Sequence, residues 1–193
     1  MNKHQAKHNS EIAPFVVDTI KGRIINPPPE LRSEQNILYK LLKSKAEPSI
    51  YSFWGYSNAL QDLDLFKSKY SYIHLDLESC YEKITYSRVV GLIRQLEIPL
   101  PTEWAKICVY EGTLMRGGIP SNYILELILK RLDYRLHGLA HRYQWKYHRY
   151  VDDLYFFITK NLHGAKYFIE KVDCIVNEEG FTINNNKTEI IRR

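Results

Sequence analysis

A pair of adjacent carboxylates, Asp152 and Asp153, constrains this chain more than any other feature. The segment before the pair, 145–150, is aromatic and basic, and the run after it, 154–158, is apolar and aromatic. Such flanks predict two strands joined by a tight turn that carries both aspartates. Aspartate is common in turns, so a plain hairpin tip without a further role is one reading. The other is a rigid, anionic oxygen site for a hard divalent cation, favoured by the apolar residues that reach up to the tip.

Composition limits the class of protein. The chain has 193 residues with 45% hydrophobic and 25% charged residues, as expected of a globular domain with a sizeable core or of two small lobes. A net charge of +5 favours a polyanionic partner. Three widely spaced cysteines form no disulfide framework, which suits a reducing cytoplasm. No apolar run approaches 18 residues and the N-terminus is polar, so we expect a cytoplasmic protein without a transmembrane helix, a signal peptide or a membrane partner.

Hydrophobic periodicity predicts an α+β architecture with an antiparallel sheet. A polar arm precedes the first predicted element, and Ser33 is the expected N-cap of the first helix. The expected elements are a polar arm at 1–13, a hairpin at 15–25, a helix from 33, a helix at 58–67, a strand at 70–77, helices at 85–96 and 121–136, a hairpin at 145–158, a helix at 163–177 and a strand at 180–191.

Asp76 is a third carboxylate that fits the pair. It ends a predicted strand in which apolar residues alternate, and a charge there is costly unless it is paired, bound to metal or exposed at the strand end. Simple exposure is the plain alternative. Placed beside Asp152 and Asp153, however, it would complete a repulsive cluster that makes sense around cations. Two Mg²⁺ ions held by such carboxylates catalyse in-line phosphoryl transfer.

Several motifs, in order, resemble those of reverse transcriptases. Residues 75–81 resemble the first palm motif, with Asp76 as metal ligand, and residues 150–153 resemble the second. The block 180–184 with Lys187 is similar to the glycine, asparagine and lysine-threonine block that follows them. Residues 21–23 resemble the basic fingers strand. The resemblance covers about 21–193.

The resemblance implies a fold and a set of roles. We expect a polymerase palm with a ferredoxin-like antiparallel sheet over 71–193 and a small fingers region over 14–70. Mg²⁺, for which Mn²⁺ may substitute, would be bound as two ions by the three aspartates, and Lys187 would assist the leaving pyrophosphate. Tyr81 stands where an aromatic ring screens the sugar of a deoxynucleoside triphosphate. Lys21 and Arg23 would touch its triphosphate.

The loop between the two metal motifs departs from the family pattern, usually Gly-x-Pro-Gln-Gly-x-x-x-Ser. Gly117 and Ser121 are kept, whereas Arg116 replaces the glutamine. We expect all three to lie at the nucleotide, where Arg116 could clamp a phosphate. The run 121–126 resembles the abortive-infection and other defence-associated reverse transcriptases of bacteria, some of which polymerise without a template.

A second departure concerns the thumb. The sequence ends at Arg193, just after the lysine block, where the family continues into a primer-grip hairpin and a helical thumb. We therefore expect the thumb to be absent here and to be supplied by a partner subunit or by a second copy of the chain.

Basic and aromatic residues are interleaved between 130 and 150, a mixture typical of a groove that follows a nucleic-acid backbone. A solvated helix face with core tyrosines is an equally good reading. His137 and His141 have helical zinc-ligand spacing but lack a third ligand, which favours a surface pair. The residues predicted to contact nucleic acid are Arg142, Lys146, Arg149 and Tyr150.

The combined prediction is an RNA-directed DNA polymerase that adds deoxynucleotides to a primer on an RNA template, in bacterial antiphage defence. The alternatives are a template-independent or protein-primed DNA polymerase and an inactive nucleic-acid-binding subunit of a polymerase complex. Three intact carboxylates argue against an inactive scaffold. The aromatic Tyr81 argues against an RNA-dependent RNA polymerase.

Overall fold

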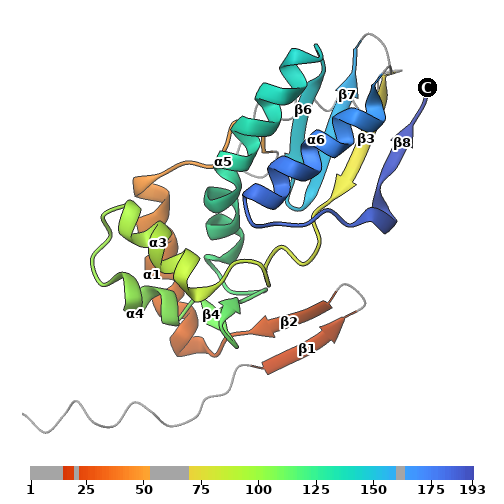
Figure 1. Cartoon of the computed structure of the whole chain (residues 1–193). Helices are drawn as coiled ribbons and strands as arrows, with labels where there is room; N and C mark the ends of the chain where they lie inside the picture. Colours follow the sequence, from red (N-terminus) through yellow and green to blue (C-terminus); the bar gives the residue numbers. More distant parts are fainter. Residues whose placement is uncertain (1–14, 20–21, 53–69, 160–163) are drawn as a thin grey trace, which may run out of the picture.

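A four-stranded antiparallel sheet lies at one end of the molecule (Figure 1). The computed structural model describes residues 15–19, 22–52, 70–159 and 164–193. The strand order is β6-β7-β3-β8, and each neighbouring pair is antiparallel. The strands are β3 (Ser71–Asp76), β6 (Lys146–Tyr150), β7 (Asp153–Ile158) and β8 (Glu189–Ile191).

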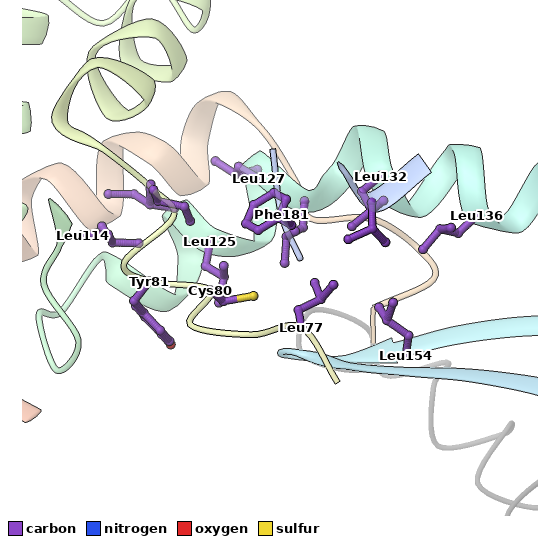
Figure 2. Packing of buried hydrophobic residues seen from close by; sticks show 14 of the residues in the cluster. Leu77, Cys80, Tyr81, Leu114, Leu125, Leu127, Leu132, Leu136, Leu154 and Phe181 are labelled. Carbon is purple, nitrogen blue, oxygen red and sulfur yellow. The ribbon is translucent and has the colours of Figure 1, made fainter. Parts of the chain in front are cut away.

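Two helices cover one face of this sheet, α5 (Ser121–Arg142) and α6 (Ala165–Glu178), as Figure 1 shows. The strands alternate accordingly, because successive side chains point to opposite faces. Ile73 and Leu75 of β3 are fully buried in the core, as are Leu154 and Phe156 of β7. Figure 2 shows Leu125, Leu132 and Leu136 of α5 packed toward Leu77 and Leu154 at the sheet. The other face of the sheet is therefore left to polar and aromatic side chains.

The remaining elements build a smaller region at the end of α5 (Figure 1). They are the hairpin β1 (Phe15–Thr19) and β2 (Gly22–Asn26), helices α1 (Pro29–Lys45), α3 (Tyr86–Gln95) and α4 (Pro101–Lys106), and the short pair β4 (Val109–Tyr110) and β5 (Thr113–Leu114).

The loop before α5 ties this region to the sheet domain. The Ile25 N–H of β2 donates to the Arg116 carbonyl at 2.7 Å. The buried Gln35 amide donates to the Ile107 carbonyl at 2.7 Å and accepts from the Ile119 N–H at 3.0 Å. These bonds fix the loop from two sides and so orient the N-terminus of α5.

The predicted α+β class with an antiparallel sheet is confirmed. The strand at 70–77, the helix at 85–96 and the hairpin at 145–158 form at those places. The expected N-cap Ser33 is wrong: α1 begins at Pro29, since proline suits the first helical turn. The helix predicted at 121–136 extends to Arg142.

The last predicted strand, 180–191, is broken. Ile183 makes one bridge to Leu77, the 3₁₀ turn η1 (Asn185–Lys187) follows, and only then does β8 begin. Helix α4 and the pair β4–β5 were not predicted, because each is too short to show a period. The expected helix at 58–67 and arm at 1–13 lie outside the described residues. No described helix has the length and apolar character needed to cross a membrane.

Candidate active site

Sheet pairing brings the three aspartates to one end of the sheet. Asp76 closes β3 and lies opposite Asp153, the first residue of β7. The Leu77 N–H, next along the chain, donates to the Asp152 carbonyl at 2.9 Å. All three line a pocket of about 790 Å³, whose lining residues are Asp76, Leu77, Glu78, Ser79, Cys80, Tyr81, Glu82, Arg116, Tyr150, Val151, Asp152, Asp153, Asn184 and Lys187. Asp76 therefore shares one site with two aspartates that lie far from it in the sequence.

Lys187 reaches the pocket from η1. Its Nζ lies 2.8 Å from Oδ1 of Asp76, which is buried. The hydrogen bond to Asp76, together with the charge of that carboxylate, raises the pKa of Lys187. The lysine is therefore held as a cation beside the first aspartate.

His74 was not among the predicted site residues. Its Nε2 lies 2.7 Å from Oδ1 of Asp153, and its ring stacks on Tyr155 with centroids 4.8 Å apart. The hydrogen bond to Asp153 is the main cause of its raised pKa. Strand periodicity could have found this residue, because His74 is two positions before Asp76 and so lies on the same face of β3.

The electrostatics of the pocket are those of crowded carboxylates. Burial first, and then the charges of Asp153 and Asp76, raise the pKa of Asp152, although a backbone hydrogen bond opposes the shift. A divalent cation would relieve this repulsion.

The side chains fit such a cation by their chemistry, since all three offer carboxylate oxygens, the donors preferred by Mg²⁺ and Mn²⁺. Among the described residues, in the positions that their side chains have here, no three His, Cys, Asp or Glu side chains converge closely enough to enclose a metal. Asp76 and Asp153 turn instead to Lys187 and His74. A metal bound at this pocket would compete with these two contacts for the carboxylate oxygens.

Tyr81 lines the pocket from the segment that follows β3. Its hydroxyl donates to Oδ1 of Asn122 at the start of α5, and the Arg116 guanidinium lies 5.5 Å from the centre of its ring. Burial raises the pKa of Tyr81 to about 12, so the hydroxyl stays protonated at neutral pH. Helix, loop and pocket thus meet at one aromatic ring.

Similarity over nearly the whole sequence identifies the family of this chain. A profile of the family described as reverse transcriptase (RNA-dependent DNA polymerase) matches residues 7–193. This chain belongs to the reverse transcriptase family.

Its relatives include retron reverse transcriptases. The retron Ec86 reverse transcriptase of Escherichia coli is 28% identical over 172 residues, which cover 86% of this chain and 52% of that protein. The retron Mx65 reverse transcriptase of Myxococcus xanthus is 32% identical over 149 residues, which cover 63% of this chain and 33% of that protein. The chain therefore spans about half or less of the length of these two relatives.

Solved telomerase structures share the fold. Telomerase from Candida albicans superposes with a TM-score of 0.55 at 10% identity, over 85% of this chain and 35% of that chain. Apo telomerase from Candida tropicalis, truncated from its C-terminal domain, gives 0.55 at 13% identity, over 93% and 49%. At these identities the likeness shows the fold alone.

Not all residues expected at the nucleotide from the reverse transcriptase resemblance line the pocket. Arg116 and Tyr81 do. Ser121 is fully buried at the start of α5, and its hydroxyl has no hydrogen-bond partner among the described residues. Gly117 has a positive φ and packs against the backbone of β2. These two shape the loop behind Arg116. Lys21 and the side chain of Arg23 lie outside what the structure describes.

The predicted nucleic-acid contacts divide in two. Arg142, Lys146 and Tyr150 are exposed, as a contact surface requires. Arg149 is not: its side chain is fully buried under α5. The prediction that Arg149 contacts nucleic acid is therefore wrong. The strand alternation that places Lys146 and Tyr150 on the open face places Arg149 on the helix face, and this parity was readable from the sequence.

Proposed function

We propose that this reverse transcriptase family member synthesises DNA at the pocket of Asp76, Asp152 and Asp153. A primer 3′-hydroxyl would attack the α-phosphate of a deoxynucleoside triphosphate and release pyrophosphate. The observation that carries the proposal is the pairing of Asp76 with Asp153 at the end of two neighbouring strands. Three carboxylates held there are costly for a protein that does not use them.

The three aspartates would hold two Mg²⁺ ions, with Mn²⁺ as a substitute. Bound there, such ions lower the pKa of the attacking hydroxyl and neutralise charge on the leaving pyrophosphate. The protein itself supplies the rigid positions: Asp76 and Asp153 by the β3–β7 ladder, Asp152 by the bond from the Leu77 N–H to its carbonyl.

The surrounding residues define the substrate side of the pocket. Tyr81 would stand against the sugar and disfavour a 2′-hydroxyl, with its ring fixed by Asn122 and Arg116. Lys187, kept cationic at Asp76, would offset charge on the triphosphate. Arg116, Lys21 and Arg23 would contact phosphates, while Gly117 and Ser121 would act through the shape of the loop.

The same proposal covers the larger setting. The sheet and its helices would form a ferredoxin-like palm over 71–193, with a fingers region over 14–70. The exposed Arg142, Lys146 and Tyr150 would follow an RNA template or a DNA primer. A partner subunit or a second copy would hold the duplex. Action in the cytoplasm is supported by three free cysteines. A role in antiphage defence is supported by the pattern of residues 121–126.

One observation favours a second candidate, synthesis without a template. The Arg116 guanidinium lies in the pocket over the Tyr81 ring, at a position where the family pattern has glutamine. A cation there could hold the triphosphate or primer phosphate without a templating base.

An extension assay tests both candidates. The purified protein is given Mg²⁺ and four deoxynucleotides, with and without an annealed RNA template and primer. The double variant Asp152→Asn, Asp153→Asn runs beside it, with Asp173→Asn on α6 as the matched control away from the pocket. Product only with template supports reverse transcription, and product without template supports the second candidate. Product that persists in the double variant would overturn both.

A further inference from the structure

A buried ionic cluster lies next to the turn of Val151 and Asp152, which joins β6 to β7. The side chain of Arg149 in β6 is 0% exposed, and those of its two acidic partners on α5 are 1% and 0% exposed. These partners are Glu126 and Asp133, seven residues and thus two turns apart on one helix face. Tyr147, also fully buried, donates its hydroxyl to Oδ1 of Asp133 at 2.8 Å.

Every N–H of the Arg149 side chain has an acceptor. Nε donates to Oδ1 of Asp133 at 2.8 Å, and Nη2 donates to Oδ2 of Asp133 at 2.9 Å and to Oε2 of Glu126 at 2.7 Å. Nη1 donates to Oε1 of Glu126 at 2.9 Å and to the Val151 carbonyl at 2.7 Å. An arginine offers five such donors in a fixed plane, and a lysine cannot reproduce that geometry.

One hydrogen bond of the cluster, from Arg149 to the Val151 carbonyl, reaches the turn that carries Asp152. Val151 has φ +56°, a left-handed conformation that is costly for a β-branched residue. Asp152 follows it directly, and the Asp152 carbonyl is bonded to Leu77. The turn is therefore held by two hydrogen bonds. Arg149 donates to the Val151 carbonyl, and Leu77, the residue after β3, donates to the Asp152 carbonyl.

Stability alone is a poor reason for such a cluster. Apolar residues of similar volume are often as stabilising as a buried ionic triad, because taking charges out of water is expensive. The cluster does something an apolar core cannot, which is to supply a directed donor to a carbonyl in a strained turn.

We propose that Arg149, oriented by Glu126 and Asp133, is a positioning residue that holds the Val151 carbonyl and thereby places the Asp152 carboxylate. The inference rests on the proposed function of the pocket. Its physical basis is that a displacement of about 1 Å in a catalytic group can cost about 10²-fold in rate. α5 thus takes part in the chemistry although it contributes no carboxylate to the pocket.

The test uses variants that loosen the cluster in different places. Arg149→Lys replaces the planar guanidinium and its five donors with a single ammonium group. Glu126→Gln keeps volume and shape but weakens the partner of Nη2 and of Nη1, the nitrogen that holds Val151. Asp133→Asn weakens the partner of Nε and Nη2, which donate no hydrogen bond to the turn. Arg135→Lys is the matched control, because Arg135 is a half-buried arginine of the same helix that pairs with Glu178 and Glu179, away from the turn.

Three quantities are measured: kcat and KM for extension, the midpoint of urea unfolding, and hydrogen exchange of peptides covering 149–154 in metal-free protein. We expect Glu126→Gln to lower kcat about tenfold or more with KM for the deoxynucleotide changed less than about twofold. Exchange in the turn should accelerate. Asp133→Asn should affect kcat less at equal loss of stability, Arg149→Lys more than either, and Arg135→Lys neither kcat nor exchange.

The outcomes separate this inference from the proposed function. If Glu126→Gln and Asp133→Asn lose kcat only in proportion to stability, with turn exchange unchanged, the positioning role is overturned. If the unsubstituted protein extends no primer, the proposed function fails, and turn exchange still decides whether Arg149 fixes the turn. Should Arg149→Lys not fold, the comparison of the Glu126 and Asp133 variants carries the test.

Discussion

At the scale of single residues, the ring of Tyr81 is held in place on two sides. It is 7% exposed, held at its hydroxyl by Asn122 and covered on its face by Arg116. In the proposed function, a ring held at both places would not move aside for a sugar. Its bulk, rather than its hydroxyl, should therefore decide which nucleotide is accepted.

We predict that Tyr81→Ala raises the use of ribonucleotides relative to deoxynucleotides at least tenfold in kcat/KM, equivalent to about 1.4 kcal/mol of discrimination. Tyr81→Phe keeps the ring and loses only the bond to Asn122, so it should keep most of the discrimination. Single-nucleotide extension with matched ribo- and deoxynucleotides measures both. Equal discrimination in Tyr81→Ala and the unsubstituted protein would contradict the steric role.

Among the elements, the loop before α5 is the tightest junction. Gly117 has φ +107°, and a Cβ there would lie 2.5 Å from the Ile25 carbonyl oxygen of β2. Only glycine allows the loop and the hairpin to approach so closely. Gly138, inside α5, is the opposite case, since a Cβ would meet nothing within 4 Å.

These two glycines give a matched pair of substitutions. Gly117→Ala should destabilise the protein by about 1–3 kcal/mol, because the loop is both strained and crowded. Gly138→Ala should stabilise it by about 0.5–1 kcal/mol, because glycine is a poor helix former. Urea unfolding measures both. The reverse order of stabilities would contradict the described junction.

At the scale of the whole molecule, the carboxylates gathered in the pocket lower stability at neutral pH. Burial and two neighbouring carboxylates raise the pKa of Asp152. A carboxyl group whose folded-state pKa lies above its unfolded value contributes stability below the unfolded pKa, and that stability is lost as pH rises through the folded pKa. At neutral pH without metal, charged Asp152 therefore weakens the fold.

We predict that Asp152→Asn is more stable than the unsubstituted protein in chelator at pH 7, by about 2–4 °C in Tm for each kcal/mol of repulsion relieved. The difference should shrink as pH falls below the folded pKa of Asp152. Mg²⁺ at about 100 times its Kd should stabilise the unsubstituted protein by about 2.7 kcal/mol and the variant much less. Thermal unfolding with and without Mg²⁺ measures this, and an equal response of both proteins would exclude Asp152 as a ligand.

The local features of this protein could be predicted from the amino-acid sequence. Apolar residues that repeat every two or every 3.6 positions predicted β3, the β6–β7 hairpin and the cores of α3, α5 and α6. The repeat arises because a strand or helix buries one of its faces. The resemblance to reverse transcriptase motifs predicted that residues from separate segments, Asp76 and Lys187 among them, belong to one site, and both line the pocket. The shortest elements, such as α4, show no period and were missed.

Which side chains meet became clear from the folded structure. His74 pairs with Asp153, Asn122 with Tyr81, and Arg149 with two acids on a helix. In the sequence, Arg149 looks like one more cation of a basic stretch, yet its side chain is buried. The physical reason is that charge is a property of a residue, whereas burial and partnership depend on how a strand face and a helix face come together across the core.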